Sequence, residues 1–384
     1  MFQHSARIRR LLWAVFAVAL VLGGWQRAAA VERLPPDFDE LIYLPAAFHY
    51  RQLAGEGSWA QLAGYRENLE HPPLVKLMFA GTLAATDAPV PDWKQVQVGR
   101  PTPEGAVPAF AATRWLSWAF GMGQLVAVGL VHPAGALGLA VSSYHAKYTA
   151  QAYLEAVPGL FALLAVLLFE RAFRRRSEEE RRRPVRVGWL LGSAVLLGLA
   201  TAGKYPYGLV VSLALAPFVL LWGRGHLRWL AAFAAVAVVA FFLADPFLWP
   251  QPLARLGESV GFHLDYSQSE HVKKSALPWW QPVYWLTRSE PYKWHAGLFF
   301  TPLADWTLLP LALAGLGRAL RVRPVFASWM ILGMIFLFLW PTKWPQYILL
   351  VLPAIAVCAG IGVESLLIRF LRPWRWSSAP DPQD

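Results

Sequence analysis

The stretch LLWAVFAVALVLGGW (residues 11–25) is an unbroken apolar run, and the acidic motif Asp37-Phe38-Asp39-Glu40 follows it closely. A helix needs about 20 apolar residues to cross the hydrocarbon core of a bilayer. Similar runs recur along the 384 residues, of which 56% are hydrophobic and only 15% charged. Soluble chains carry about 25% charged residues. The sequence therefore predicts an all-α polytopic membrane protein.

The apolar runs predict about ten transmembrane helices in a single integral membrane domain over residues 1–384. The expected spans are 11–27, 111–130, 134–150, 152–173, 187–203, 206–222, 229–248, 297–317, 325–340 and 346–369. The third span is short and is interrupted by polar residues, among them Ser142 and Ser143.

Arginines are concentrated between these runs and set the expected topology. The clusters are Arg7, Arg9 and Arg10; Arg171, Arg174, Arg175, Arg176, Arg181, Arg182 and Arg183; Arg224 and Arg228; Arg318, Arg321 and Arg323; and Arg369, Arg372 and Arg375. Cytoplasmic loops of membrane proteins are enriched in Lys and Arg. With about ten spans and a cytoplasmic N-terminus, every cluster faces the cytoplasm. The net charge of +11 is explained in this way, and we expect no nucleic-acid partner.

The same topology places two long loops outside the cell membrane, which we take to be the plasma or inner membrane. The first loop (residues 28–110) carries the acidic motif, and the second loop (residues 250–296) is rich in aromatic residues. Within the first loop the apolar run 74–85 is too short to cross a bilayer, so we expect an interfacial helix there.

The N-terminus also resembles a signal peptide, because Arg7-Ile8-Arg9-Arg10 precedes the apolar run and Ala28-Ala29-Ala30 resembles a cleavage site. We favour a retained first helix, since it would anchor the acidic motif beside the remaining helices.

Ionisable residues stand at the helix ends that this topology places outside. They are Arg114, Lys147, Glu155, Lys204, Asp245 and Lys343. Charges near a bilayer are costly unless they are paired or lie in a wet cavity. Each could instead be an interfacial anchor, and Glu155 and Asp245 are expected to give structural support, with Glu155 paired to Lys147 or Lys204. Together they predict a polar cavity that would accept a phosphate at membrane depth.

Four motifs resemble the GT-C membrane glycosyltransferases, in particular the protein O-mannosyltransferase-like family (bacterial glycosyltransferase family 39 type). They are Asp39-Glu40; His71-Pro72-Pro73-Leu74-Val75-Lys76; Arg114 with Ser117 and Gly121; and Lys343-Trp344-Pro345-Gln346-Tyr347. The chain departs from the family in having fewer spans and no large soluble domain between its late helices.

The resemblance implies a GT-C-like bundle and an inverting transfer of sugar from a polyprenyl-phosphate donor to an acceptor hydroxyl. Asp39 matches the family's catalytic base, which deprotonates the acceptor. We expect substrate contacts from Glu40, His71, Lys76, Arg114, Lys204, Lys343 and Tyr347. The partners implied are the lipid-linked sugar, membrane lipids, and an acceptor that is a protein, a lipid or a glycan. The sequence does not identify the sugar, the acceptor, the polyprenol length or the oligomeric state.

Simpler interpretations compete with this reading. Asp37 and Asp39 could be helix caps, and His71 before two prolines could be a turn residue. No cofactor is expected. A divalent metal ion is not expected either, although the acidic residues leave that alternative open; Cys358 is the only cysteine, so a cysteine-based metal site is ruled out. A transporter or flippase of lipid-linked sugars would need the cationic cavity but not Asp39, and an envelope scaffold would need neither.

Overall fold

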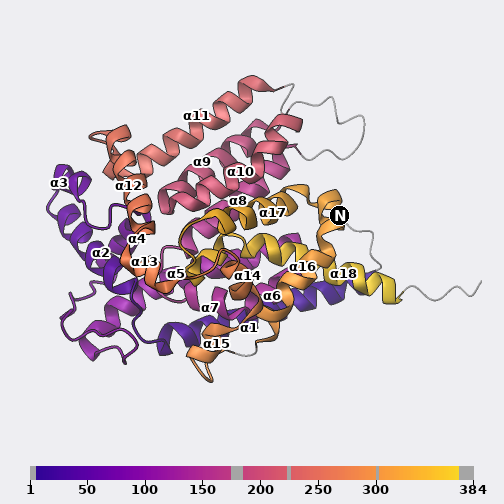
Figure 1. Ribbon diagram of the computed structural model, residues 1–384, viewed down its shortest axis with the longest axis horizontal. Coiled ribbons are helices and arrows are strands. Elements are labelled where there is room, and N and C mark those ends of the chain that lie inside the picture. The colour runs from indigo at the N-terminus through magenta and orange to yellow at the C-terminus, as the bar shows by residue number, and fades with distance from the viewer. Residues whose placement is uncertain (1–5, 174–184, 223–225, 300–301, 372–384) are drawn as a thin grey trace, which may run out of the picture.

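The computed structural model describes residues 6–173, 185–222, 226–299 and 302–371, and within these ranges every regular element is a helix. The first-loop helices α2, α3 and α4 gather with α12 at one end of a helical bundle, at the left of Figure 1. The last helix, α18, extends toward the opposite end. The chain is thus a bundle with an elaborated cap at one end.

The long helices follow the predicted spans closely. They are α1 (Ala6–Arg33), α5 (Val107–Val131), α8 (Ala156–Phe173), α9 (Val187–Gly203), α10 (Tyr205–Trp222), α11 (Leu227–Ala244), α16 (Leu303–Val322), α17 (Pro324–Leu339) and α18 (Leu352–Leu371). Six of the helices in the described ranges are long and apolar enough to cross a membrane: α1, α8, α10, α11, α16 and α18. Together with shorter apolar helices such as α9 and α17, they confirm a multi-pass, all-helical membrane protein.

The predicted span 134–150 is wrong as a single helix. It is divided into α6 (Pro133–Val141) and α7 (Ser143–Tyr148), with an extended residue, Ser142, between them. The break is stabilised by Asp305 of α16, which accepts hydrogen bonds from the Ser142 hydroxyl at 2.8 Å and from the Ser143 backbone N–H at 3.2 Å. A buried carboxylate at the first turn of α7 satisfies donors that a continuous helix would have satisfied internally.

Arg27 of α1 stabilises the other side of the same break. Its guanidinium donates to the carbonyl oxygens of Leu139 and Ala140 at the end of α6, at 3.0 and 2.9 Å. It also lies 3.2 Å from the Thr149 hydroxyl oxygen and is fully buried. Because α1 continues unbroken through Ala28–Ala30 to Arg33, the first loop begins six residues later than its expected start at residue 28.

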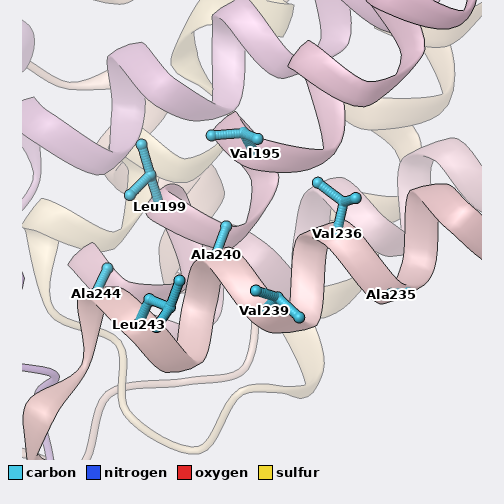
Figure 2. A pocket seen from close by; sticks show the side chains of 8 residues that line it. All are labelled: Val195, Leu199, Ala235, Val236, Val239, Ala240, Leu243 and Ala244. Carbon is cyan, nitrogen blue, oxygen red and sulfur yellow. The ribbon is translucent and has the colours of Figure 1, made fainter.

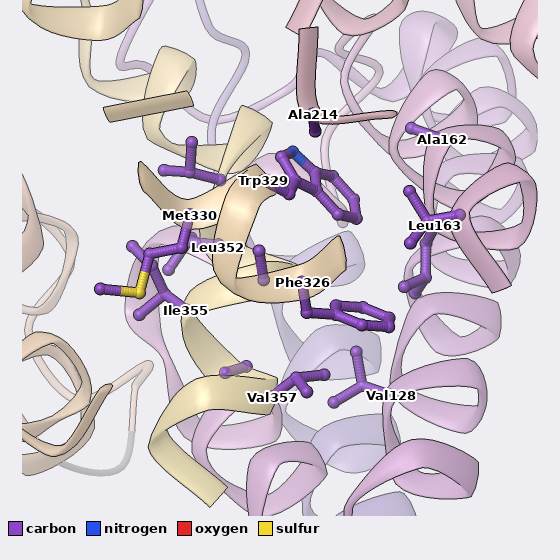
Figure 3. Close-up of a cluster of buried hydrophobic side chains, with 14 of the residues drawn as sticks. Val128, Ala162, Leu163, Ala214, Phe326, Trp329, Met330, Leu352, Ile355 and Val357 are labelled. Atoms are coloured by element: carbon purple, nitrogen blue, oxygen red, sulfur yellow. The ribbon is translucent and has the colours of Figure 1, made fainter. Parts of the chain in front are cut away.

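The largest hydrophobic core lies where α17 and α18 meet α5 and α8 (Figure 3). Trp329 and Phe326 of α17 are fully buried there, beside Leu163 of α8 and Val128 of α5. The Trp329 indole N–H donates to the Leu350 carbonyl oxygen at 2.9 Å, so its polar atom is satisfied inside the core.

The first loop has a hydrophobic core of its own. In it α2 (Glu40–Gly55) packs against α4 (Leu74–Ala85), and α3 (Trp59–Gly64) contacts α2. Leu44 of α2 and Phe79 of α4 are fully buried in this smaller cluster. The first loop is therefore a packed cap on the bundle.

The second loop forms α12 (Pro252–Ser267), α13 (Glu270–Ser275), α14 (Gln281–Thr287) and α15 (Glu290–Trp294). Helix α12 is held on the first loop by one of its faces. Ser259 donates to the Leu69 carbonyl oxygen at 2.7 Å, and His263 Nε2 lies 3.0 Å from the Glu70 carbonyl oxygen. The two loops are thereby joined beside the acidic motif.

An apolar groove of about 570 Å³ lies between α9 and α11 (Figure 2). It is lined by Val195, Leu199, Ala235, Val236, Val239, Ala240, Leu243 and Ala244. Helix α11 packs mainly against α9, and Phe233 is the one residue of α11 that is buried. Beyond the residues that line the groove, α9 is followed by Lys204 and α11 by Asp245, and α4 of the first loop contacts α9.

Candidate active site

Asp39 stands immediately before α2 and is partly buried. Its Oδ2 atom accepts long hydrogen bonds, of 3.4 Å each, from the Tyr43 hydroxyl and from Gln346 Nε2. Burial raises the pKa of Asp39 to about 7, the nearby Glu155 carboxylate adds to this effect, and the Lys204 ammonium opposes it. The Asp39 side chain makes no capping hydrogen bond in the described structure, so the geometry does not support a simple cap.

Two ion pairs flank Asp39, one buried and one partly buried. Lys147 of α7 pairs with Asp37, and Lys204 pairs with Glu155, which precedes α8. This settles the partner of Glu155, for which both lysines were candidates. Burial by itself raises the pKa of Asp37, but Lys147 outweighs it and lowers that pKa below its usual value. The two neighbouring aspartates thus have opposite pKa shifts, as in sites where carboxylates take different roles.

Arg114 of α5 is fully engaged with the protein. Its Nε and Nη2 atoms donate to the two carboxylate oxygens of Glu40 at 2.7 and 2.6 Å. Its Nη1 atom donates to the carbonyl oxygens of Val31 and Leu34 at 3.1 and 2.7 Å, and Nη2 also donates to that of Pro35 at 3.1 Å. A guanidinium has five N–H donors. All of them are therefore used to hold the chain between α1 and α2.

Glu40 is equally occupied and has no exposed surface. Besides Arg114, it accepts the backbone N–H of Ala152 at 2.8 Å and that of Asp37 at 3.0 Å. These contacts hold Glu40, the residue next to Asp39, in a fixed position. We infer that Glu40 and Arg114 position Asp39 and do not contact the substrate.

Lys76 fixes the loop that carries His71. Its ammonium donates to the Asn68 carbonyl and amide oxygens at 2.9 and 3.1 Å and to the His71 carbonyl oxygen at 3.0 Å. An ammonium has three hydrogens, so Lys76 has none left for a ligand in this arrangement.

Lys343 has a similar position at the end of α17. Its ammonium donates to the carbonyl oxygens of Leu337, Phe338 and Trp340, the first two at 2.8 and 3.0 Å. A cation near the C-terminus of a helix satisfies carbonyls that lack an intrahelical partner. The geometry thus favours a structural role for Lys343.

Lys204 differs from these three cations. Among the residues that the structure describes, its ammonium has one hydrogen-bond partner, Glu155, and it lies 5.1 Å from the centre of the Tyr347 ring. The second carboxylate oxygen of Glu155 and the Tyr207 hydroxyl are buried without a partner in the described ranges. Lys204 therefore keeps free N–H groups next to unsatisfied polar atoms and close to Asp39.

His71 is held beside Asp39 through Tyr43, with the His71 and Tyr43 ring centres 5.9 Å apart. Burial lowers the pKa of His71 well below its usual value, and the Lys204 charge adds to this, so the imidazole is neutral. Its Nδ1 atom is buried and has no hydrogen-bond partner in the described part of the chain. A turn residue would not require such an environment.

Asp245 is fully buried but belongs to a neighbouring group. Its Oδ2 atom accepts a hydrogen bond from the Tyr205 hydroxyl at 3.3 Å, and burial raises the pKa of Asp245 to about 7, with Lys76 opposing. Asp245 supports the polar end of the bundle, and within the described ranges its side chain forms no hydrogen bond with Asp39.

Sequence reasoning missed several residues of this site. The sequence offered Asp37 as a helix cap or as one of the acids that could hold a metal ion, not as the partner of Lys147. Gln346 stood in a motif without a role of its own, and Tyr43 and His263 were not predicted. Tyr43 could have been found, because it lies one helical turn after Asp39. The others come from distant segments and had no local signal. Independence from a metal ion stays a prediction.

No protein-family profile matches this chain, and no curated protein matches it in sequence. Solved structures do resemble it. ArnT from Cupriavidus metallidurans bound to undecaprenyl phosphate aligns with a TM-score of 0.61 at 16% identity, over 94% of this chain and 61% of that chain. The apo state of ArnT gives a TM-score of 0.56 at 17% identity, over 94% and 60% of the two chains.

A third structure is the archaeal oligosaccharyltransferase AglB from Archaeoglobus fulgidus in complex with an inhibitory peptide and a dolichol-phosphate. It aligns with a TM-score of 0.50 at 10% identity, over 95% of this chain and 51% of that chain. This chain thus spans about three-fifths of the length of ArnT. The similarity shows that this chain shares its fold with ArnT and AglB, as the motif resemblance implied. A role in sugar transfer and placement in the O-mannosyltransferase-like branch stay predictions.

Proposed function

We propose that this multi-pass membrane protein with the GT-C fold transfers a sugar, with inversion, from a polyprenyl-phosphate donor to an acceptor hydroxyl. The single observation that carries the proposal is the position of Asp39 close to Lys204, whose charge acts on the Asp39 carboxyl group. A carboxylate with a pKa of about 7 lies near a buried cation that keeps free N–H groups. A general base works best when its pKa is near the working pH.

Asp39 and Lys204 together account for the proton and the charge that move during the transfer. The acceptor oxygen attacks the anomeric carbon, its proton passes to Asp39, and the bond from the anomeric carbon to the phosphate oxygen breaks. The phosphate leaves with the bonding electrons and gains one negative charge. Lys204 would stabilise that charge in the buried site. Phosphate is a good leaving group, so no protonating acid is required.

The bundle also supports a donor that is anchored in lipid. The lining of the apolar groove between α9 and α11 includes Leu199 and Ala244, and the two helices are followed by Lys204 and Asp245. A prenyl chain in this groove would bring its phosphate to the polar end of the bundle. ArnT was solved with undecaprenyl phosphate and AglB with a dolichol-phosphate, and we extend that donor class to this chain as a proposal.

Arginines support an extracytoplasmic active site and a cytoplasmic N-terminus. Arg171, Arg321 and Arg369 lie in the last turns of α8, α16 and α18, at the helix ends away from Asp39. Because cytoplasmic ends are enriched in arginine, we propose that the first loop faces outward from a cell membrane. The cytoplasmic position of the arginines at 174–176, 181–183, 224, 372 and 375 was also predicted, but these residues lie outside the described ranges.

The direct test is to incubate the purified protein with a panel of polyprenyl-phosphate sugars and candidate acceptors, followed by mass analysis. We expect at least one donor to lose its sugar with the appearance of polyprenyl phosphate and a glycosylated acceptor. If no member of a panel covering hexoses and pentoses releases sugar, the proposal fails.

Replacing Lys204 by Gln should lower kcat roughly 10²–10³-fold, the usual effect of removing one group that stabilises transition-state charge. Single-turnover kinetics with saturating donor measures this step. The double variant Lys204→Gln with Glu155→Gln is the matched control, because it removes the partner charge and leaves no unpaired buried carboxylate. A double variant with the wild-type kcat would show that the Lys204 charge plays no part in transfer.

A further inference from the structure

Five aromatic side chains form a continuous series beside Asp39. From Tyr43 the series passes to His71, then to His263 of α12, then to Trp340 after α17, and finally to Tyr347. The successive ring centres are 5.9, 5.7, 5.7 and 6.4 Å apart. We name these five residues the aromatic wall.

Both ends of the aromatic wall return to the proposed reaction centre. Tyr43 donates a hydrogen bond to Asp39, and the Tyr347 ring lies against the Lys204 ammonium. Gln346, next to Tyr347, also donates to Asp39 at 3.4 Å. The wall thus begins at the proposed base and ends at the proposed phosphate-binding cation.

Two ring nitrogens in the middle of the wall lack hydrogen bonds. His71 Nδ1 and Trp340 Nε1 are both buried without a partner among the residues that the structure describes. Buried polar groups are nearly always hydrogen-bonded in folded proteins. An unsatisfied pair on one wall suggests that a ligand supplies the partners.

The wall is held rigidly by both loops and the bundle. His263 is fixed by its contact with the Glu70 carbonyl oxygen, and the Trp340 ring stacks on Phe336 with the ring centres 5.0 Å apart. Lys76 holds the His71 backbone through its carbonyl oxygen at 3.0 Å. Preorganised groups lose little entropy when a ligand binds.

We propose that the aromatic wall is the subsite for an uncharged sugar ring, with His71 and Trp340 hydrogen-bonded to its hydroxyls. This assignment rests on the proposed function and names the residues of the same site that contact the sugar. Sugar rings combine apolar C–H faces, which pack on aromatic rings, with a rim of hydroxyls. The tyrosine and tryptophan side chains of the wall are uncharged, and burial lowers the pKa of both His71 and His263. A site of this composition favours an uncharged sugar.

The test compares the binding of a polyprenyl-phosphate sugar with that of bare polyprenyl phosphate, without acceptor. His71→Phe and Trp340→Phe keep an aromatic ring but remove the nitrogen. Each should reduce the preference for the sugar-bearing lipid about five- to tenfold, the effect of one lost hydrogen bond. Affinity for the bare lipid should not change. Trp279→Phe is the matched control, because Trp279 is exposed and lies outside the wall.

The outcomes separate this inference from the proposed function. If the wild-type protein transfers sugar but neither variant changes the preference, or bare-lipid affinity falls equally, the sugar subsite is wrong and the transferase proposal stands. If the preference is unchanged but the KM of a glycan acceptor rises about fivefold, the wall binds sugar on the acceptor side. A wild-type protein without transfer activity would overturn the proposed function itself.

Discussion

Asp39→Asn should lower kcat by roughly 10²–10⁴-fold, the contribution of a general base. Asn cannot accept the proton of the acceptor hydroxyl, yet it keeps the size of Asp39 and can still contact Tyr43 and Gln346. Donor affinity should change little, because the proposed phosphate contact is with Lys204. Sugar release by purified variant and wild-type protein, at saturating donor, measures the loss. If neither protein released sugar and the Asp39→Asn variant still transported the lipid-linked sugar, the results would favour a flippase.

The pH profile provides a control that does not depend on folding of the variant. A base must be deprotonated, so wild-type kcat/KM should fall as the pH is lowered through about 7, the pKa of Asp39. Residual activity of Asp39→Asn should lack this step. Asp87→Asn is a matched surface control, since Asp87 forms an exposed pair with Arg51. A wild-type profile that stays flat between pH 5 and 8 would contradict the role of Asp39 as base.

Arg114→Ala should destabilise the protein by about 3–5 kcal/mol, because it leaves the buried Glu40 carboxylate without its partner. The guanidinium also joins three backbone carbonyls at the end of α1 to the start of α2. Arg114→Lys should recover only part of the stability, since an ammonium has three donors and no planar fork. Thermal unfolding in detergent, followed by tryptophan fluorescence, measures the effect.

Arg51→Ala is the control for the Arg114 prediction. Arg51 pairs with Asp87 at 2.9 Å, but the Asp87 side chain is 96% exposed. Removing a surface ion pair costs about 0–1 kcal/mol. If Arg114→Ala unfolded like the wild type while donor binding was lost, Arg114 would be a phosphate ligand, as the motif resemblance implied, and its contacts with Glu40 would be secondary.

Much of the fold was predictable from the sequence. Apolar runs identified the long helices to within a few residues at most ends, since α9 covers the same residues, 187–203, as the expected span. The motifs around Asp39 and His71 implied the fold that this chain shares with ArnT and AglB. These features are readable because helix length and hydrophobicity are local properties that a bilayer selects directly.

The break between α6 and α7 was not predictable in this way. The polar residues Ser142 and Ser143 marked a weak point, but their partner Asp305 is more than 160 positions away. Whether serines bend a helix or hydrogen-bond within it depends on what a distant helix brings to them.

The roles of the cations were decided by tertiary structure alone. In sequence, Arg114, Lys204 and Lys343 are equivalent positive charges at helix ends. In the folded chain, protein oxygens occupy every donor of Arg114, and three carbonyls surround the Lys343 ammonium. Lys204, in contrast, has only Glu155 as a hydrogen-bond partner in the part of the chain that the structure describes. The sequence by itself determined most of the long apolar helices and which acids follow the first of them. Only the tertiary structure decided which charges stay available, because a hydrogen-bond partner is chosen by distances between segments that are far apart in the chain.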